Sequence, residues 1–322
     1  MGYPRYLQVP PDKPGIYHCT SRCVRRAFLC GEDSVTGLSF EHRKHWLEAR
    51  IMSLATIYAV AIHAYAVMSN HFHVVLEIDP TAPLQWSDDE VARRWLALSA
   101  KADESESALE KRIAALVVQP KRLTELRKRL GSLGWYMRYL KEPIARQANK
   151  EDDCKGHFWE SRYGAQALLD DPAILSSMVY VDLNPIRAGI AETPEQSLHT
   201  SVRARTQGAQ DNDDACIQPL ASSIRSQLSI VTTAQYLELV DWTGRTLHPG
   251  KRGMIAGDAP PIIKRLGLRP QQWCLQVPAT ESHYRRAIGQ LDALLAIAQQ
   301  AGLKWIRGIG MARRLQRVND TT

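Results

Sequence analysis

The chain has 322 residues, of which 44% are hydrophobic and 23% charged. This composition excludes a wholly disordered chain, and the length allows a large core and more than one domain. A formal net charge of +7 favours a polyanionic partner, nucleic acid before membrane. The six cysteines form no C-x-x-C pair and the N-terminus lacks the apolar core of a signal peptide. We therefore expect a reducing, cytoplasmic location and no membrane contact.

The first 78 residues predict the order β-α-β-β. Residues 17–23 (Y-H-C-T-S-R-C) are β-rich and bounded by turn residues, and residues 40–60 carry apolar side chains at helical spacing. Residues 63–68 and 71–78 are expected strands, joined as a hairpin by Ser69-Asn70. The apolar run that precedes this hairpin is interrupted by His63, so we expect a buried helix that leads into a strand, and no membrane span.

The middle of the chain is predicted to be helical from residue 80 to about residue 134. Ser87 and Glu90 have the spacing of a capping box. Residues 121–150 contain nine Lys or Arg against two Glu, with Trp135 and Tyr136 among them. Such a run is explained equally by a solvated helix face and by a nucleic-acid surface.

The second half divides at a polar segment. Residues 156–169 are expected to form a loop that leads into a strand, and Asp171-Pro172 begins a helix that Pro185 ends. Residues 206–216 are polar and turn-rich, as in a linker. We therefore predict a domain over residues 1–205 and a mostly helical region over residues 217–322, whose role stays open between extra DNA binding, autoinhibition and dimerisation.

Two histidines stand on one strand of the predicted hairpin. Side chains alternate along a strand, so His71 and His73 point to one face while Phe72 and Val74 point to the other. Two neutral imidazoles suit a transition metal that has at least one further ligand. A pair of half-buried histidines bonded to backbone is the simpler explanation of H-x-H on its own.

Three sequence motifs favour a metal site over a pair of structural histidines. In the order Y-A-V-M-S-N-H-F-H-V-V-L-E, G-H-F-W-E-S-R-Y and Y-V-D-L-N-P-I-R-A-G, the chain resembles the REP-associated tyrosine transposases, relatives of the small single-tyrosine insertion-sequence transposases of the HUH type. The resemblance covers about residues 4–202. It implies an α+β fold with a ferredoxin-like core, an antiparallel sheet that carries the His-x-His strand, and a helical insertion at about residues 80–134. It also implies a nucleoid-associated protein that acts on single-stranded or hairpin DNA with palindromic repeats.

The resemblance also implies the catalytic residues. His71 and His73 match the metal-binding pair, Asn184 matches the polar residue that completes the site for Mg²⁺ or Mn²⁺, and Tyr180 matches the nucleophile. The metal would polarise the scissile phosphate, and Tyr180 would form a 5′-phosphotyrosine link that keeps the bond energy for rejoining.

Sequence spacing helps to decide which tyrosine is the nucleophile. Tyr180 and Asn184 are four residues apart and share one face of a continuous helix, although Pro185 favours a helix end at Asn184. Tyr163, and after it Tyr139, are the rival nucleophiles. A core tyrosine is the simpler explanation of any one of them.

Basic and aromatic side chains supply candidate DNA contacts. A phosphate is gripped by guanidinium groups and a single-stranded base stacks on aromatic rings. The candidates are Arg22, Arg25, Arg26, Arg162, Arg187, Trp135 and Tyr136, with Trp159 the weakest of the aromatic ones. Each arginine taken alone is more often a solvated charge.

Two other functions compete with a DNA transesterase. A catalytically idle hairpin-binding regulator would lack part of the set His71, His73, Tyr180 and Asn184, which is complete here. A histidine-triad nucleotide hydrolase needs a third histidine at the next alternate position, where Val75 stands, so we reject it. The sequence leaves open whether the protein is a monomer or a dimer.

Overall fold

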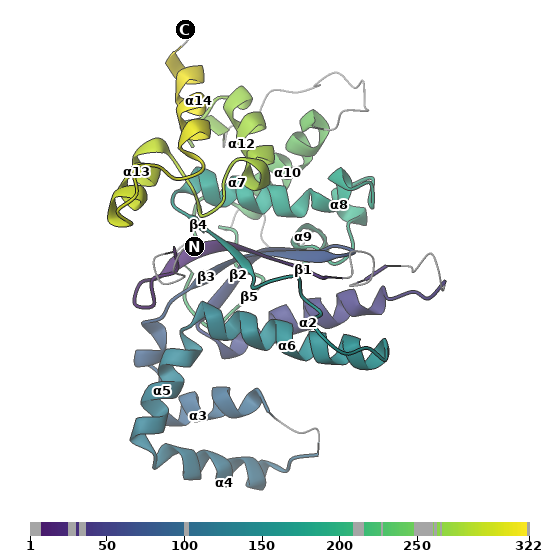
Figure 1. Ribbon diagram of the computed structural model, residues 1–322, viewed down its shortest axis with the longest axis vertical. Helices are drawn as coiled ribbons and strands as arrows, with labels where there is room; N and C mark the ends of the chain where they lie inside the picture. The colour runs from purple at the N-terminus through teal and green to yellow at the C-terminus, as the bar shows by residue number, and fades with distance from the viewer. Residues whose placement is uncertain are drawn as a thin grey trace.

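The computed structural model describes residues 8–24, 30–31, 37–99, 103–208, 216–226, 228–247, 260, 263–264 and 266–320. A six-stranded sheet in the order β5-β2-β3-β1-β4-β6 divides the molecule into two layers (Figure 1). The strands are β1 (Gly15–Arg22), β2 (Val60–Val67), β3 (His71–Ile78), β4 (Gly164–Leu168), β5 (Ala221–Ser222) and β6 (Ala287–Ile288). All neighbours pair antiparallel except β4 and β6, which pair parallel.

The four central strands confirm the predicted α+β fold with a ferredoxin-like core. Their order β4-β1-β3-β2 is antiparallel throughout, and helices α2 (His42–Ile57) and α6 (Leu133–Glu151) make the two connections across one face. The hairpin predicted at Ser69-Asn70 joins β2 to β3. The apolar segment before it is, as predicted, the end of α2 running into β2, and no helix in the described part of the chain is long and apolar enough to cross a bilayer.

Alternation along the strands assigns each side chain to one layer. On β3, Phe72, Val74 and Leu76 belong to the hydrophobic cluster on the α2 side, whereas Val75 belongs to the cluster on the opposite side. His71 and His73 therefore share the Val75 face, as the two-residue period requires.

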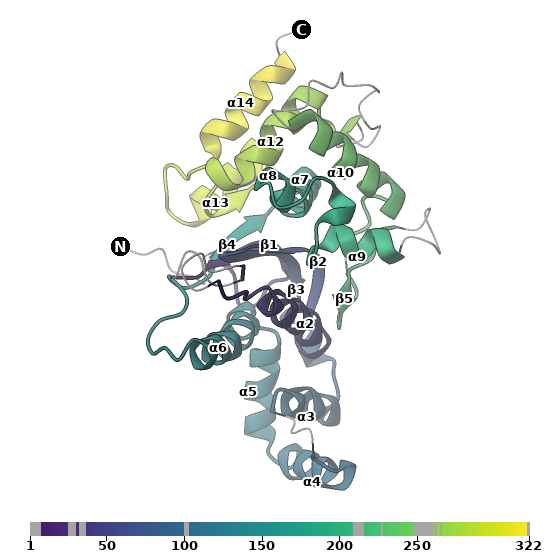
Figure 2. The same ribbon diagram turned by 90° about the vertical axis from the view of Figure 1, so that its right-hand side faces the viewer.

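The predicted insertion forms an arm below the α2–α6 layer (Figure 2). Ser87 caps the first of its main helices by accepting a hydrogen bond from the Glu90 backbone nitrogen at 3.1 Å, as the sequence predicts. The arm returns to the sheet at Gly131, where a Cβ would lie 2.8 Å from Pro80 Cα, so only glycine allows this approach. Its elements are η1 (Ala82–Leu84), α3 (Asp88–Ala97), α4 (Glu106–Val117) and α5 (Pro120–Leu130).

Helix α7 (Asp171–Asp182) lies on the histidine face of the sheet. It begins where the Asp170 carboxylate accepts a hydrogen bond from the Ala173 backbone nitrogen at 2.9 Å. It ends at Leu183, and Pro185 lies in the first turn of the short α8 (Asn184–Arg187). All twelve α7 residues but Asp171 are buried, so the helix is covered on every side.

The region after the predicted linker, residues 217–322, is called the tail below. It buries the side of α7 that faces away from the sheet. It contributes β5 and β6 to the sheet edges and packs α10 (Thr233–Leu247) and α12 (Pro270–Ser282) against α7 (Figures 1 and 2). Tail residues such as Tyr236 and Trp273 form one continuous hydrophobic cluster with Met178 and Tyr180. Residues 209–215 of the linker lie outside the described residues, and the domain division stays a prediction. Before the linker lies η2 (Pro194–Gln196), and α9 (Ser201–Gly208) runs into it. The helices after the linker are α10, α12, α13 (Leu291–Gln300) and α14 (Ile309–Asp320).

Candidate active site

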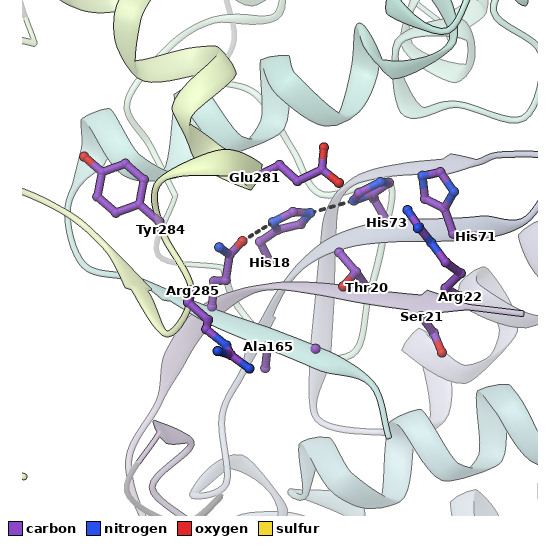
Figure 3. Close-up of a pocket in the computed structure, with 12 residues that line it drawn as sticks. His18, Thr20, Ser21, Arg22, His71, His73, Ala165, Glu281, Tyr284 and Arg285 are labelled. Atoms are coloured by element: carbon purple, nitrogen blue, oxygen red, sulfur yellow. Dashed lines mark hydrogen bonds between the residues drawn. The ribbon is translucent and has the colours of Figure 1, made fainter. Parts of the chain in front are cut away.

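Strand register brings three histidines to one face of the sheet (Figure 3). Thr20 of β1 pairs with His73 of β3, so His18, two residues earlier on β1, projects from the same face. The ring centroids of His71 and His73 are 4.9 Å apart, and those of His18 and His73 are 5.1 Å apart.

Helix α7 places Tyr180 over this cluster. The Tyr180 ring centroid is 5.7 Å from that of His73 and 6.0 Å from that of His18. The structure therefore brings Tyr180 to His71 and His73, which precede it by more than a hundred positions in the sequence.

His73 offers an unused nitrogen. Its ring is buried, its Nδ1 lies 2.9 Å from His18 Nε2, and its Nε2 is buried without a hydrogen-bond partner. An unpartnered buried nitrogen costs free energy of about 1–3 kcal/mol unless a ligand takes it. His71 Nδ1 contacts Asn70 Oδ1 at 2.6 Å, which leaves Nε2 as the nitrogen turned away from Asn70. Two such imidazoles fit a divalent metal ion.

Both rings are held neutral, as metal ligation requires. Burial, and then the nearby positive charge of Arg22, lowers the pKa of His71 to about 4. Burial lowers the pKa of His73 well below its usual value, and the neighbouring His18 and His71 add to the effect.

Asn184 lies one helical turn beyond Tyr180, and it is not among the residues that line the cavity beside the histidines. It begins α8, one residue beyond the α7 end where we expected it, is buried, and its Nδ2 donates to the Tyr180 carbonyl oxygen at 3.4 Å. Within the described residues, no group of three or more His, Cys, Asp or Glu side chains is arranged to hold a metal. A metal here would therefore depend on two imidazoles and an amide oxygen.

The Tyr180 hydroxyl is engaged. It donates a hydrogen bond to the Glu281 carboxylate at the end of α12, and Tyr180 as a whole is 0% exposed. Burial, then the hydrogen bond and negative charge of Glu281, raises the pKa of Tyr180 to about 12. The Arg187 guanidinium lies 4.8 Å from the ring centroid. Glu281 itself is exposed, so a change in its side-chain rotamer would release the hydroxyl.

A cavity of about 250 Å³ opens beside the histidines. Its floor is free of a side chain at Gly164, where a Cβ would lie 2.7 Å from Thr20 Oγ1. The residues that line it are His18, Thr20, Ser21, Arg22, His71, His73, Gly164, Ala165, Gln166, Glu281, Tyr284 and Arg285. The cavity suits a phosphate group, because the positively charged side chains of Arg22 and Arg285 line it.

Sequence reasoning missed His18, Gln166 and Glu281. His18 alternates with Thr20 and Arg22 on the predicted first strand, and this pattern could have placed it on one face with the other histidines once the strand pairing was known. Glu281 gives no signal, because it lies 101 positions from Tyr180 in a region with no recognisable motif.

The predicted DNA contacts fall into separate places. Arg22 and Arg187 are exposed beside the histidine cluster, and Arg162 is exposed on the loop before β4. Arg25 and Arg26 lie outside the described residues. Tyr136 is 0% exposed and donates from its hydroxyl to the Ile51 carbonyl oxygen at 3.3 Å, so its assignment as a base-stacking residue is wrong: it is a core residue.

Trp135 and the rival tyrosines lie on the other layer. The Trp135 ring packs between the guanidinium groups of Arg129 and Arg138, at 4.4 and 5.1 Å from its centroid. Tyr139 and Tyr163 are half-buried against the α2–α6 cluster. Neither rival tyrosine therefore shares the sheet face with His71 and His73.

No protein-family profile matches the chain, and no curated protein is significantly similar to it. A solved structure of a REP-associated tyrosine transposase bound to a REP hairpin is similar at 12% sequence identity, over 67% of this chain and 90% of that one, with a TM-score of 0.33. Membership of that family stays a prediction from the three sequence motifs.

Proposed function

We propose that this chain is a metal-dependent DNA transesterase that cleaves and rejoins single-stranded DNA at palindromic hairpins through Tyr180. One observation carries the proposal: the buried, unpartnered Nε2 of His73 lies in a cluster with His71, and the ring of a helix-borne tyrosine packs against it. Neutral imidazoles with a free nitrogen beside a phenol form a constellation suited to phosphodiester chemistry.

The chain's own residues perform the transfer as follows. The Tyr180 hydroxyl leaves Glu281 and turns to a phosphate in the cavity. Tyr180 Oη bonds to phosphorus, the bond from phosphorus to the 3′-oxygen breaks, the phenol proton passes to water, and the departing oxygen takes up a proton to become a 3′-OH. Arg22 lines the cavity and the Arg187 guanidinium lies 4.8 Å from the Tyr180 ring centroid, so their charges would stabilise the negative phosphorane oxygens.

The metal would be held by His71, His73 and Asn184. A bound Mg²⁺ or Mn²⁺ supplies positive charge that polarises the scissile phosphate. Imidazole ligands favour Mn²⁺ over Mg²⁺, which prefers oxygen, so we expect stronger activity with Mn²⁺.

A catalytically idle hairpin-binding protein is the second candidate. It is favoured by the full burial of Tyr180 and by the hydrogen bond that its hydroxyl donates to Glu281. Such a protein would bind the same hairpins through its arginines and would leave the DNA intact.

One experiment separates the two. The full chain is incubated with a panel of end-labelled palindromic single strands and scrambled, non-palindromic controls, with Mn²⁺, with Mg²⁺ or with EDTA. We expect a covalent protein–DNA adduct on denaturing gels that depends on the palindrome and the metal and maps to Tyr180 by peptide mass spectrometry. Tight hairpin binding with no adduct in either metal would leave the idle binder as the function.

A further inference from the structure

A chain of hydrogen bonds links the backbone of the tail to His73. The Thr280 carbonyl oxygen on α12 accepts from Gln166 Nε2 at 3.1 Å, Gln166 Oε1 lies 2.7 Å from His18 Nδ1, and His18 Nε2 lies 2.9 Å from His73 Nδ1. The last two contacts are the dashed lines in Figure 3. Gln166 and His18 each have a hydrogen-bond partner on both sides in this chain. His73 ends the chain, because its Nε2 has no partner.

The orientation of Gln166 is fixed by its first partner. A backbone carbonyl can only accept, so the atom of Gln166 that faces Thr280 must be the amide nitrogen. The opposite orientation would set two acceptor oxygens at 3.1 Å. The Gln166 atom that faces His18 is therefore the oxygen.

That oxygen fixes the proton on His18. An amide oxygen only accepts, so His18 Nδ1 carries the hydrogen, and in the neutral ring Nε2 is then a bare lone pair. A hydrogen bond between two ring nitrogens needs one bare nitrogen and one N–H. His73 Nδ1, which faces His18 Nε2, must therefore supply the hydrogen.

The proton on His73 Nδ1 leaves its Nε2 bare in the neutral ring. This is the same Nε2 that is buried without a protein partner. We propose that Gln166 and His18 are positioning residues, which hold His73 in the Nδ1–H tautomer and so keep the Nε2 lone pair ready for a divalent cation. The proposal rests on the metal-dependent function above.

Residues outside the metal's immediate ligands commonly act in this way. A ligating histidine usually donates its other N–H to a fixed acceptor, and loss of that acceptor typically costs roughly 10–100-fold in metal affinity. Here the acceptor is another imidazole, and its own tautomer is set from a helix in the tail. The tail therefore contributes to the metal site without supplying a ligand.

The tautomers can be read directly in the protein without metal. In ¹⁵N-histidine-labelled protein with EDTA, two-dimensional NMR distinguishes protonated from bare ring nitrogens, and the His73→Ala spectrum assigns the His73 signals. We expect both His18 and His73 to carry their proton on Nδ1. A His73 ring protonated at Nε2 in the wild type would overturn the proposal, and this measurement needs no folded variant of the positioning residues.

Two substitutions at one position test the coupling to metal. His18→Gln keeps an acceptor oxygen near the place of the imidazole Nε2, whereas His18→Leu removes it. By Mn²⁺ titration followed by electron paramagnetic resonance, we expect His18→Leu to bind roughly 10–100-fold more weakly and His18→Gln to stay within a few-fold of the wild type. Equal affinities in the wild type and His18→Leu would refute the positioning role.

The tests of the positioning role can fail or succeed independently of the test of the transesterase function. A wild-type protein with the expected tautomers and Mn²⁺ affinity that forms no DNA adduct would disprove the transesterase and leave the positioning role intact. Adduct formation in a protein whose His73 carries its proton on Nε2 would do the reverse.

Discussion

The hydroxyl of Tyr180 donates a hydrogen bond to the carboxylate of Glu281, which joins α7 to the end of α12. The proposed nucleophile is thereby held in its protonated form by a residue of the tail, since the negative charge of Glu281 adds to the effect of burial on the pKa of Tyr180. While this bond persists, the hydroxyl hydrogen is held by Glu281 and cannot be donated to a phosphate.

Glu281→Ala should therefore increase the rate of adduct formation. A hydrogen bond to a charged group contributes about 1.5 kcal/mol, so its loss is expected to raise the single-turnover rate by roughly tenfold. The pKa of Tyr180, followed by NMR of ¹³Cζ-labelled tyrosine, should fall at the same time. Ser282→Ala, at the exposed neighbouring position, is the control and should change neither. A slower reaction in Glu281→Ala would show that the carboxylate assists the attack.

Tyr180→Phe removes one oxygen and keeps the ring in the core. We expect the variant to fold with a loss of about 1 kcal/mol in the free energy of unfolding, to bind hairpin DNA and Mn²⁺, and to form no adduct. Denaturing gels measure the adduct and thermal unfolding measures the stability. Tyr163→Phe and Tyr139→Phe are the matched controls on the opposite layer, and an adduct that disappears in either of them would identify a different nucleophile.

Removal of either strand histidine should separate cleavage from binding. His71→Ala and His73→Ala are expected to abolish adduct formation and weaken Mn²⁺ binding, while hairpin affinity stays within a few-fold because it rests on phosphate contacts. Gel-shift and metal titrations report the two properties independently. His45→Ala, an exposed histidine on α2, should behave as the wild type. Full cleavage in both strand variants would remove the metal from the mechanism.

The sequence predicts the sheet better than the site. Strands β1 and β3, helix α7 and the shared face of His71 and His73 follow from periodicities of two and 3.6 residues, which act over a few positions. Contacts between distant segments have no such local signature. The Tyr180–Glu281 bond and the His18–Gln166 contact both depend on how the tail and the strand order fold together. The sequence wrongly predicts that Tyr136 contacts DNA, because an aromatic ring in a basic helix gives the same local pattern whether it faces solvent or the core.

Acid should destabilise the metal-free protein. Burial lowers the pKa of His18 to about 4, whereas the unfolded chain binds this proton near pH 6.5. Between these values the unfolded state holds more protons, so the free energy of unfolding falls as the pH falls. His18 alone accounts for up to about 3 kcal/mol of this loss. Urea unfolding in EDTA at several pH values measures it, and His18→Gln should show a shallower dependence. Parallel curves for the two proteins would contradict the origin we assign.

The tail is expected to unfold together with the sheet. Trp273 of α12 is buried in the same hydrophobic cluster as Tyr180, and its Nε1 donates to Thr243 Oγ1 at 2.9 Å. Trp273→Ala should therefore lower the free energy of unfolding of the whole chain by about 3–5 kcal/mol. Trp305, which is 59% exposed in the same region, is the matched control, and Trp305→Ala should change it by no more than about 0.5 kcal/mol.

The number of transitions decides whether the division at residues 206–216 separates two domains. One shared cluster over α7 predicts a single cooperative transition in the wild type, with the same midpoint by tryptophan fluorescence and by far-ultraviolet circular dichroism. Trp273→Ala should move that single transition to lower denaturant concentration without splitting it. An early transition that Trp273→Ala shifts, followed by a late one that it leaves unchanged, would mean that the first 205 residues fold alone and that the tail only covers Tyr180.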